Sequence, residues 1–134
     1  MENKYLCPKC RALLNVRENI VFSAENSKKQ RGLFLLNANL GNYQMLHDPE
    51  FKYEAGDRLD FYCPVCNNSL GIPKINKDLA EILMIDNTGE EFEIVFSEIA
   101  GKRLTMKIRD NTVVESFGDD SGEFQNYWGE RPRY

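Results

Sequence analysis

Short apolar runs separated by turn residues occupy most of the chain. Leu104, Met106 and Ile108 alternate with polar neighbours, and this period of two is typical of a half-buried strand. The apolar runs 82–85 and 92–96 flank a short polar turn, which predicts a β-hairpin. The pattern therefore predicts a mostly β protein with a C-terminal antiparallel β region.

The N-terminal half has the same character, and its candidate strands are 20–22, 33–36, 43–46 and 59–62. Two segments are also compatible with helix. Residues 76–78 can cap a short helix that begins near Leu79, and residues 97–100 can form one helical turn before Gly101. We find no repeat of fixed period. No apolar run approaches the roughly 18 residues that a membrane span needs, so we expect no membrane association.

The cysteines form two short motifs, Cys7-Pro8-Lys9-Cys10 and Cys63-Pro64-Val65-Cys66. Two residues between thiolates allow a tight turn, here called a knuckle, to direct both sulfurs at one cation. Proline presets the turn, and its missing N–H leaves the following amides to bond the sulfurs. Two knuckles together supply the four soft ligands that suit tetrahedral zinc or iron.

These motifs resemble the knuckles of zinc ribbons and rubredoxin-like proteins. The resemblance covers the two motifs and their flanks, and it implies that Cys7, Cys10, Cys63 and Cys66 bind one Zn²⁺ per chain. The chain departs from the compact ribbon in the 52 residues between the knuckles (11–62), which we expect to form a β-hairpin insert. Arg11 and Asn67 also stand where many such knuckles have glycine. Because arginine adopts left-handed conformations poorly, we expect a distorted first knuckle.

Other uses of the cysteines are weighed against zinc. An iron centre for electron transfer would use the same ligands. Disulfides need an oxidising compartment, whereas the N-terminal residues lack the apolar run of a signal peptide, so we expect a cytoplasmic protein. A thiol redox site of the glutaredoxin type would need a strand and a connection before Cys7, and six residues are too few for them.

Charge separates the two halves of the chain. The net charge of −4 divides into +1 for residues 1–66 and −5 for residues 67–134, and a Zn²⁺ with four thiolates would add −2. The densest basic cluster, Lys28, Lys29 and Arg31, is expected at a hairpin tip. A nucleic-acid interface is the alternative function. It would combine these residues and Lys9, Arg11 and Arg17 with stacking tyrosines drawn from Tyr5, Tyr43 and Tyr62.

No catalytic constellation is visible. Four cysteines close a zinc shell and leave no position for a reactive water. His47 is the single histidine, and we expect it in a surface loop. We therefore predict that the chain is not an enzyme.

The C-terminal tail carries Phe124, Tyr127 and Trp128 in a polar context. These aromatics either pack on the β core or anchor a partner. We expect a zinc-ribbon-like region at 1–75 and a hairpin-rich region at 76–134 that pack together, since each is small for an independent core. The leading prediction is a noncatalytic, zinc-stabilised module that binds protein partners.

Overall fold

The computed structural model describes residues 3–39, 45–100, 104–110 and 112–118. Within these residues eleven strands form two antiparallel sheets, and none of the residues is helical. The mostly β prediction is confirmed. No helix of sufficient length and apolarity to cross a membrane occurs among the described residues.

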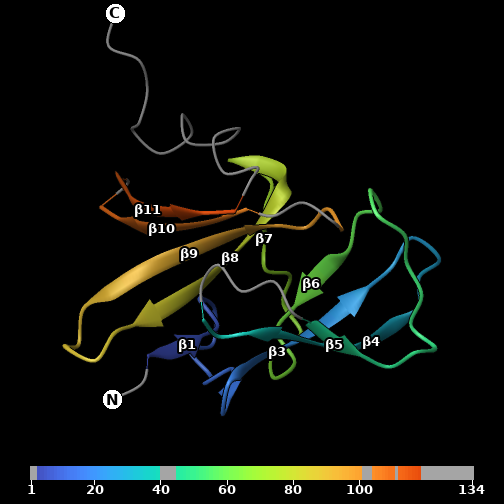
Figure 1. Ribbon diagram of the computed structural model, residues 1–134, viewed down its shortest axis with the longest axis horizontal. Coiled ribbons are helices and arrows are strands. Elements are labelled where there is room, and N and C mark those ends of the chain that lie inside the picture. Colours follow the sequence, from blue (N-terminus) through green and yellow to red (C-terminus); the bar gives the residue numbers. More distant parts are fainter. Residues whose placement is uncertain (1–2, 40–44, 101–103, 111, 119–134) are drawn as a thin grey trace, which may run out of the picture.

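The C-terminal sheet (Figure 1) has the strand order β1-β8-β9-β10-β11, with β7 pairing beside β1 on β8. Its strands are β1 (Lys4–Leu6), β7 (Gly71–Ile72), β8 (Asn76–Ile85), β9 (Glu91–Ser97), β10 (Thr105–Arg109) and β11 (Thr112–Phe117). Residues 76–78 thus begin a strand rather than cap a helix. The helical turn expected at 97–100 is also wrong, because Ser97 ends β9 and Ile99 makes an isolated β-bridge to Arg58.

The N-terminal sheet has the order β2-β3-β4-β5, with β6 pairing beside β2 on β3. Its strands are β2 (Asn15–Val16), β3 (Asn19–Glu25), β4 (Arg31–Asn37), β5 (Met45–His47) and β6 (Asp60–Tyr62). Every candidate strand of the N-terminal half therefore corresponds to an observed strand. His47 lies in β5 rather than in a loop, with its ring stacked on Phe34 at 5.4 Å.

One apolar core lies between the sheets. β3 alternates buried Ile20, Phe22 and Ala24 with half-buried residues. Opposite them, β9 contributes Ile94 and Phe96 to the same cluster. Ring centroids of Phe22 and Phe96 are 5.4 Å apart, so the two sheets are in direct contact. Burial of these rings supplies the main force that holds the sheets face to face.

The two halves of the chain repeat one topology. The β3–β4 hairpin pairs Phe22 with Phe34, and the β8–β9 hairpin pairs Ile82 with Ile94, a shift of 60 positions. The next ladder keeps this shift: Leu35 pairs with Leu46, and Val95 pairs with Met106. We call residues 4–47 repeat 1 and residues 60–107 repeat 2.

The repeats exchange their first strands. β1 pairs with β8 through Tyr5 and Met84, while β6 pairs with β3 through the equivalent Phe61 and Ala24. In this segment the shift is 56 positions, as from Cys7 to Cys63. The shift changes because the β7–β8 turn is longer than the β2–β3 turn and carries a bulge. The two repeats are therefore intertwined, each completing the sheet of the other.

Candidate metal centre

Each knuckle lies where the chain crosses from one sheet to the other. Cys7 and Cys10 follow β1 of the C-terminal sheet and lead to β2 of the N-terminal sheet. Cys63 and Cys66 follow β6 and lead back to β7. A metal held by both knuckles would therefore join the two crossovers between the sheets.

The four sulfurs converge on one point. The Sγ atoms of Cys7 and Cys66 are 3.8 Å apart, as are those of Cys10 and Cys63. All four lie within 4.8 Å of one another. Tetrahedral zinc with Zn–S bonds of about 2.3 Å requires sulfur separations of about 3.8 Å, so this donor set fits a tetrahedral metal ion.

Backbone amides surround the inner sulfurs in the same way in both knuckles. The amides of Lys9 and Cys10 donate to Cys7 Sγ at 3.3 and 3.5 Å. Those of Val65 and Cys66 donate to Cys63 Sγ at 3.3 and 3.4 Å. These residues follow the prolines, as the sequence predicts. Such N–H donors stabilise thiolates and so prepare the sulfurs for a metal ion.

The expected distortion of the first knuckle is wrong. Arg11 and Asn67 both take left-handed conformations, with φ of 62° and 63°. Their amides donate equally to the carbonyls of Cys7 and Cys63, at 2.9 Å each. Arginine therefore accepts the strained conformation that the turn requires. Its guanidinium pairs with Glu91 at 3.1 Å on the surface.

The inner and outer cysteines of each knuckle differ in environment. Cys7 and Cys63 are fully buried, Cys10 is exposed and Cys66 is half-buried. Burial raises the pKa of the Cys63 thiol to about 12. Metal binding must therefore displace a proton from Cys63, which makes the affinity fall at low pH.

Asn68 is a contributor that the sequence did not identify. Its backbone amide, together with its side chain, lowers the pKa of the Cys66 thiol to about 7. The side-chain amide lies 3.3 Å from Cys66 Sγ. The equivalent Ala12 has no such group, so this contact occurs in one knuckle only. The signal in the sequence was an asparagine two residues after the second cysteine of the knuckle, close enough for its side-chain amide to reach that sulfur.

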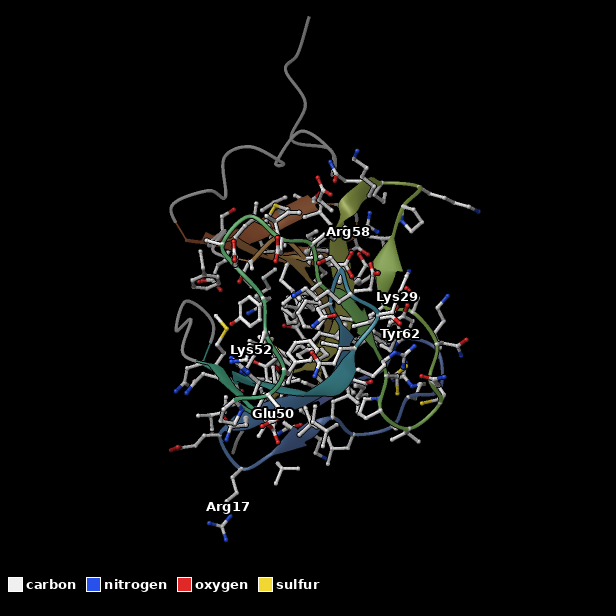
Figure 2. All side chains as sticks on the ribbon, turned by 90° about the vertical axis from the view of Figure 1, so that its right-hand side faces the viewer. Arg17, Lys29, Glu50, Lys52, Arg58 and Tyr62 are labelled. Carbon is white, nitrogen blue, oxygen red and sulfur yellow. The ribbon has the colours of Figure 1, made fainter. Side chains whose placement is uncertain are left out.

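The residues of the alternative nucleic-acid interface differ in their exposure and in the contacts that they make. Lys28 and Lys29 are exposed in the β3–β4 turn, as the hairpin prediction requires. Arg31 is occupied: its guanidinium lies 3.8 Å from the centre of the Tyr62 ring and donates to Asn67 Oδ1 at 2.8 Å. Figure 2 shows Arg17 far from Lys29, pointing into solvent.

Two of the three proposed stacking tyrosines lie within the described residues. Tyr5 is 1% exposed and its hydroxyl donates to the Ala38 carbonyl at 2.8 Å, so its assignment as a stacking residue is wrong. Tyr62 is half-buried beneath Arg31. Tyr43 and the tail aromatics Phe124, Tyr127 and Trp128 lie outside the described residues.

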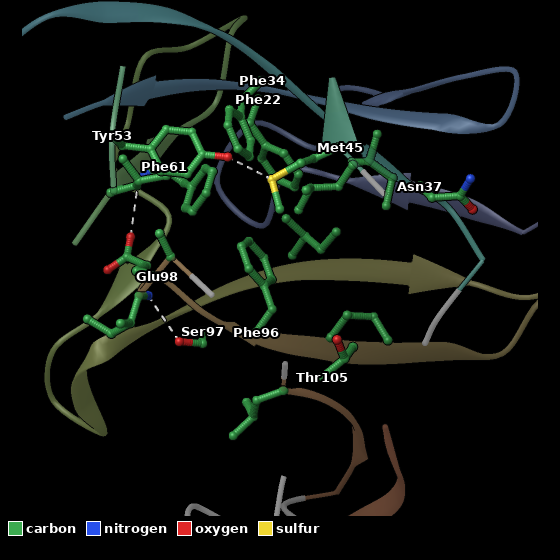
Figure 3. Close-up of a pocket in the computed structure, with 18 of the residues that line it drawn as sticks. Phe22, Phe34, Asn37, Met45, Tyr53, Phe61, Phe96, Ser97, Glu98 and Thr105 are labelled. Carbon is green, nitrogen blue, oxygen red and sulfur yellow. Dashed lines mark hydrogen bonds between the residues drawn. The ribbon is translucent and has the colours of Figure 1, made fainter. Parts of the chain in front are cut away.

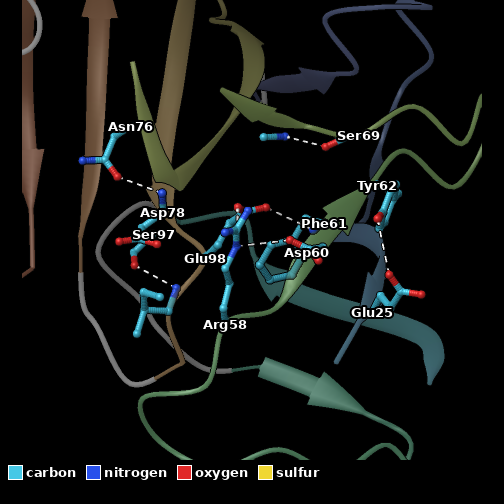
Figure 4. A network of polar contacts seen from close by, with 12 residues as sticks. Glu25, Arg58, Asp60, Phe61, Tyr62, Ser69, Asn76, Asp78, Ser97 and Glu98 are labelled. Atoms are coloured by element: carbon cyan, nitrogen blue, oxygen red, sulfur yellow. Dashed lines mark hydrogen bonds and ion pairs between the residues drawn. The ribbon is translucent and has the colours of Figure 1, made fainter. Parts of the chain in front are cut away.

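A buried carboxylate lies near the second crossover (Figure 4). Glu98 accepts from the Phe61 amide through Oε2 at 3.2 Å, and its Oε1 lies 3.9 Å from Arg58 Nε. Oε1 accepts no hydrogen bond from the described residues. Burial raises the pKa of Glu98 to about 7. Sequence reasoning missed this group because Glu98 stands in the segment 97–100, which was expected to form one helical turn.

Comparison of the chain with protein-family models, with curated proteins and with solved structures found no match.

Proposed function

We propose that the chain is a noncatalytic, zinc-stabilised module that binds a partner protein through the outer face of its N-terminal sheet. Zinc is the proposed metal because four thiolates close a tetrahedral shell that has no open position for substrate or water. The ion would tie the two sheet crossovers together. A reducing cytoplasm would keep the thiols available for it.

The observation that carries this proposal is an apolar face of repeat 1 whose counterpart in repeat 2 is either buried or acidic. Val21, Leu35 and Leu46 form a row across the N-terminal sheet, and Leu33 lies in the next row. Leu33 and Leu46 are 57% and 60% exposed. Val16, at the end of β2 and on the same side of the sheet, is 61% exposed. We call these five residues the apolar face.

Two of the equivalent positions in repeat 2 hold buried apolar residues, and the equivalents of Val21 and Leu33 are the half-buried acids Glu81 and Glu93. Val95 and Met106 correspond to Leu35 and Leu46, and both have no exposed surface. They form a second buried cluster with Leu79, Leu104 and Ile108. Repeat 2 thus buries its apolar residues at this face, whereas repeat 1 leaves Leu46 exposed. Contiguous apolar surface that stays exposed marks a protein-interaction site.

The edge of the N-terminal sheet favours an extended segment as the bound element. In repeat 2, β10 pairs with β9 on one side and β11 on the other. Among the described residues, the equivalent β5 pairs with β4 alone. A partner strand placed beside β5 would occupy the position that β11 takes in repeat 2. Its side chains would then extend the row at Leu46.

Metal analysis tests the first part of this proposal. Protein purified without added metal should contain one zinc per chain and be colourless. Coloured protein with bound iron and a reversible redox change would replace zinc by the electron-transfer alternative.

Partner capture tests the second part. Wild-type protein and Leu46→Glu are compared with Val114→Glu, a matched control on the exposed side of β11, where Val114 is 51% exposed. A specific partner should bind the wild type and Val114→Glu and be lost from Leu46→Glu. Hydrogen exchange should show protection of the β5 amides in the complex. Equal binding by all three proteins would contradict the assignment of this face.

A further inference from the structure

A cavity lies between the two sheets, away from the apolar face. Its volume is about 100 Å³ and it is not sealed from solvent. Both repeats line it, in part through equivalent positions such as Phe22 with Ile82, Phe34 with Ile94 and Leu36 with Phe96. The cavity therefore lies where the two repeats meet.

We propose that this cavity binds a small neutral organic molecule with an apolar body of about one six-membered ring and one oxygen acceptor. Protein interiors are normally packed without voids of this size, and an apolar cavity of comparable volume takes up benzene-sized guests. Sites at the interface of two structural units are the commonest places for such ligands.

The lining determines the charge of the guest. None of the described lining residues is a lysine, an arginine or a histidine, and most of them are aliphatic or aromatic. Glu98 belongs to the wall, but its carboxylate is engaged by the Phe61 amide and faces Arg58 (Figures 3 and 4). Glu98 is thus the one acidic group of the described lining, and Arg58 already faces it. The rest of the described lining is mostly aliphatic and aromatic, which favours a neutral guest.

Tyr53 supplies the polar end. Its hydroxyl lies over the cavity and contacts Met45 Sδ at 3.0 Å (Figure 3). A thioether is a weak acceptor, so a carbonyl oxygen would receive a stronger hydrogen bond from the same hydroxyl. Met45 has three rotatable side-chain bonds and is 39% exposed, so it is free to move aside for the guest. Tyr53 is a binding residue in this proposal and has no catalytic role.

The experiment uses the full chain with its metal, labelled with ¹³C at isoleucine and methionine methyl groups. Cyclohexanone is titrated beside methylenecyclohexane, which has the same shape and lacks the oxygen. Both should shift the methyl signals of Ile82, Ile94 and Met45 and leave Ile72, outside the cavity, unchanged. The ketone should bind about fivefold more tightly, the value of one net hydrogen bond.

Two variants separate the contributions of shape and hydrogen bonding. Leu36→Phe fills the cavity with the side chain that its equivalent Phe96 already has, and it should abolish the shifts. Leu35→Phe, on the opposite side of β4, should leave them intact. Tyr53→Phe should remove the preference for the ketone while both compounds still bind.

Absence of shifts at Ile82 and Ile94 with saturating ketone would overturn it, as would equal binding to the wild type and Leu36→Phe. An unchanged preference in Tyr53→Phe would overturn the assignment of the polar end. None of these results depends on the partner protein, because the apolar face lies on the other side of the N-terminal sheet.

Discussion

The two repeats share their pairing registers yet differ in how they treat equivalent positions. Their hairpin turns are built alike: Asn26 Oδ1 accepts from the Lys28 amide at 3.0 Å, and Asp86 Oδ1 accepts from the Thr88 amide at 2.9 Å. The strands that follow diverge, because repeat 1 exposes Leu46 and repeat 2 buries Met106. Backbone geometry is thus common to both repeats, and the face that each presents to solvent is not.

The difference shows how one topology supports two tasks. Repeat 2 forms the well-covered sheet with a second buried cluster, which contributes stability. Repeat 1 contains the basic turn and the exposed apolar residues, which are available for contacts. The knuckles are the part in which the two repeats are most alike, since the inner sulfur of each accepts from the same two backbone amides.

Loss of the metal should have the largest effect and should affect both repeats equally. Binding of structural zinc contributes about 10–16 kcal/mol in small domains, which is comparable with or larger than typical net stability. Chelation should therefore abolish cooperative thermal unfolding, measured by circular dichroism. Cys7→Ser and Cys63→Ser, at equivalent buried positions, should lose the same amount of stability. An unchanged melting temperature after verified metal removal would contradict a structural role.

Truncation at one pair of equivalent positions should reveal the difference between the faces. Met106→Ala removes a fully buried side chain and should lower the free energy of unfolding by about 2–5 kcal/mol. Leu46→Ala removes an exposed one and should change it by less than about 0.5 kcal/mol. Denaturant titration of both variants measures this. Similar losses would mean that Leu46 is buried in solution, for instance against a second copy.

The buried acid of repeat 2 should make stability depend on pH. The pKa of Glu98 is raised from 4.5 to about 7, so between these values the folded state holds a proton that the unfolded state releases. Its stabilising contribution is complete below about pH 4.5 and is lost as the pH rises through about 7. The loss amounts to about 2–3 kcal/mol by pH 8.

Glu98→Gln should therefore reduce the slope of the pH profile of stability between pH 5 and 8 and exceed the wild type in stability at pH 8. Glu81, whose pKa burial also raises to about 7, should keep the rest of the slope. The equivalent position in repeat 1 is Ala38, so repeat 1 has no titratable side chain there. Glu50→Gln, which removes an exposed acid, serves as the control and should leave the profile unchanged. The same slope in wild type and Glu98→Gln would show that another group is responsible.

The smallest expected effect is at the left-handed residues of the knuckles. A left-handed conformation costs a non-glycine residue about 1 kcal/mol, and asparagine pays less than arginine. Arg11→Gly should raise the free energy of unfolding by several tenths to about 1 kcal/mol, reduced by the loss of the exposed Glu91 pair. Asn67→Gly should gain less. A larger gain for Asn67→Gly would contradict this ranking.

Local patterns predicted most of the elements. The alternation of apolar and polar residues predicted β10, and the polar turn predicted the β8–β9 hairpin. The two cysteine motifs predicted the positions of the four thiols. Each of these depends on neighbours within a few residues. Helix expectations near residues 76 and 97 failed because strand pairing with distant segments overrode the local cap and turn signals.

The repeat escaped detection for a physical reason. Register is set by which backbone groups pair and by which side faces the core, and many side chains satisfy both requirements. Phe22 and Ile82 are equivalent, as are Leu36 and Phe96, yet their identities differ. The change of shift from 56 to 60 positions at the β7–β8 turn further hides the relation. The two cysteine motifs were the part of the sequence in which the similarity of the repeats could be recognised.

The sequence by itself determined the strand-rich class and the grouping of cysteines into two metal-binding turns, because backbone periodicity and ligand spacing are local properties. Only the tertiary structure decided that the knuckles meet as equivalent parts of two intertwined repeats. It also decided that Tyr5 is buried, that Glu98 lies inside and that Leu46 faces solvent. These outcomes depend on contacts between segments far apart in the chain, and hydrophobic burial is settled only when the sheets pack.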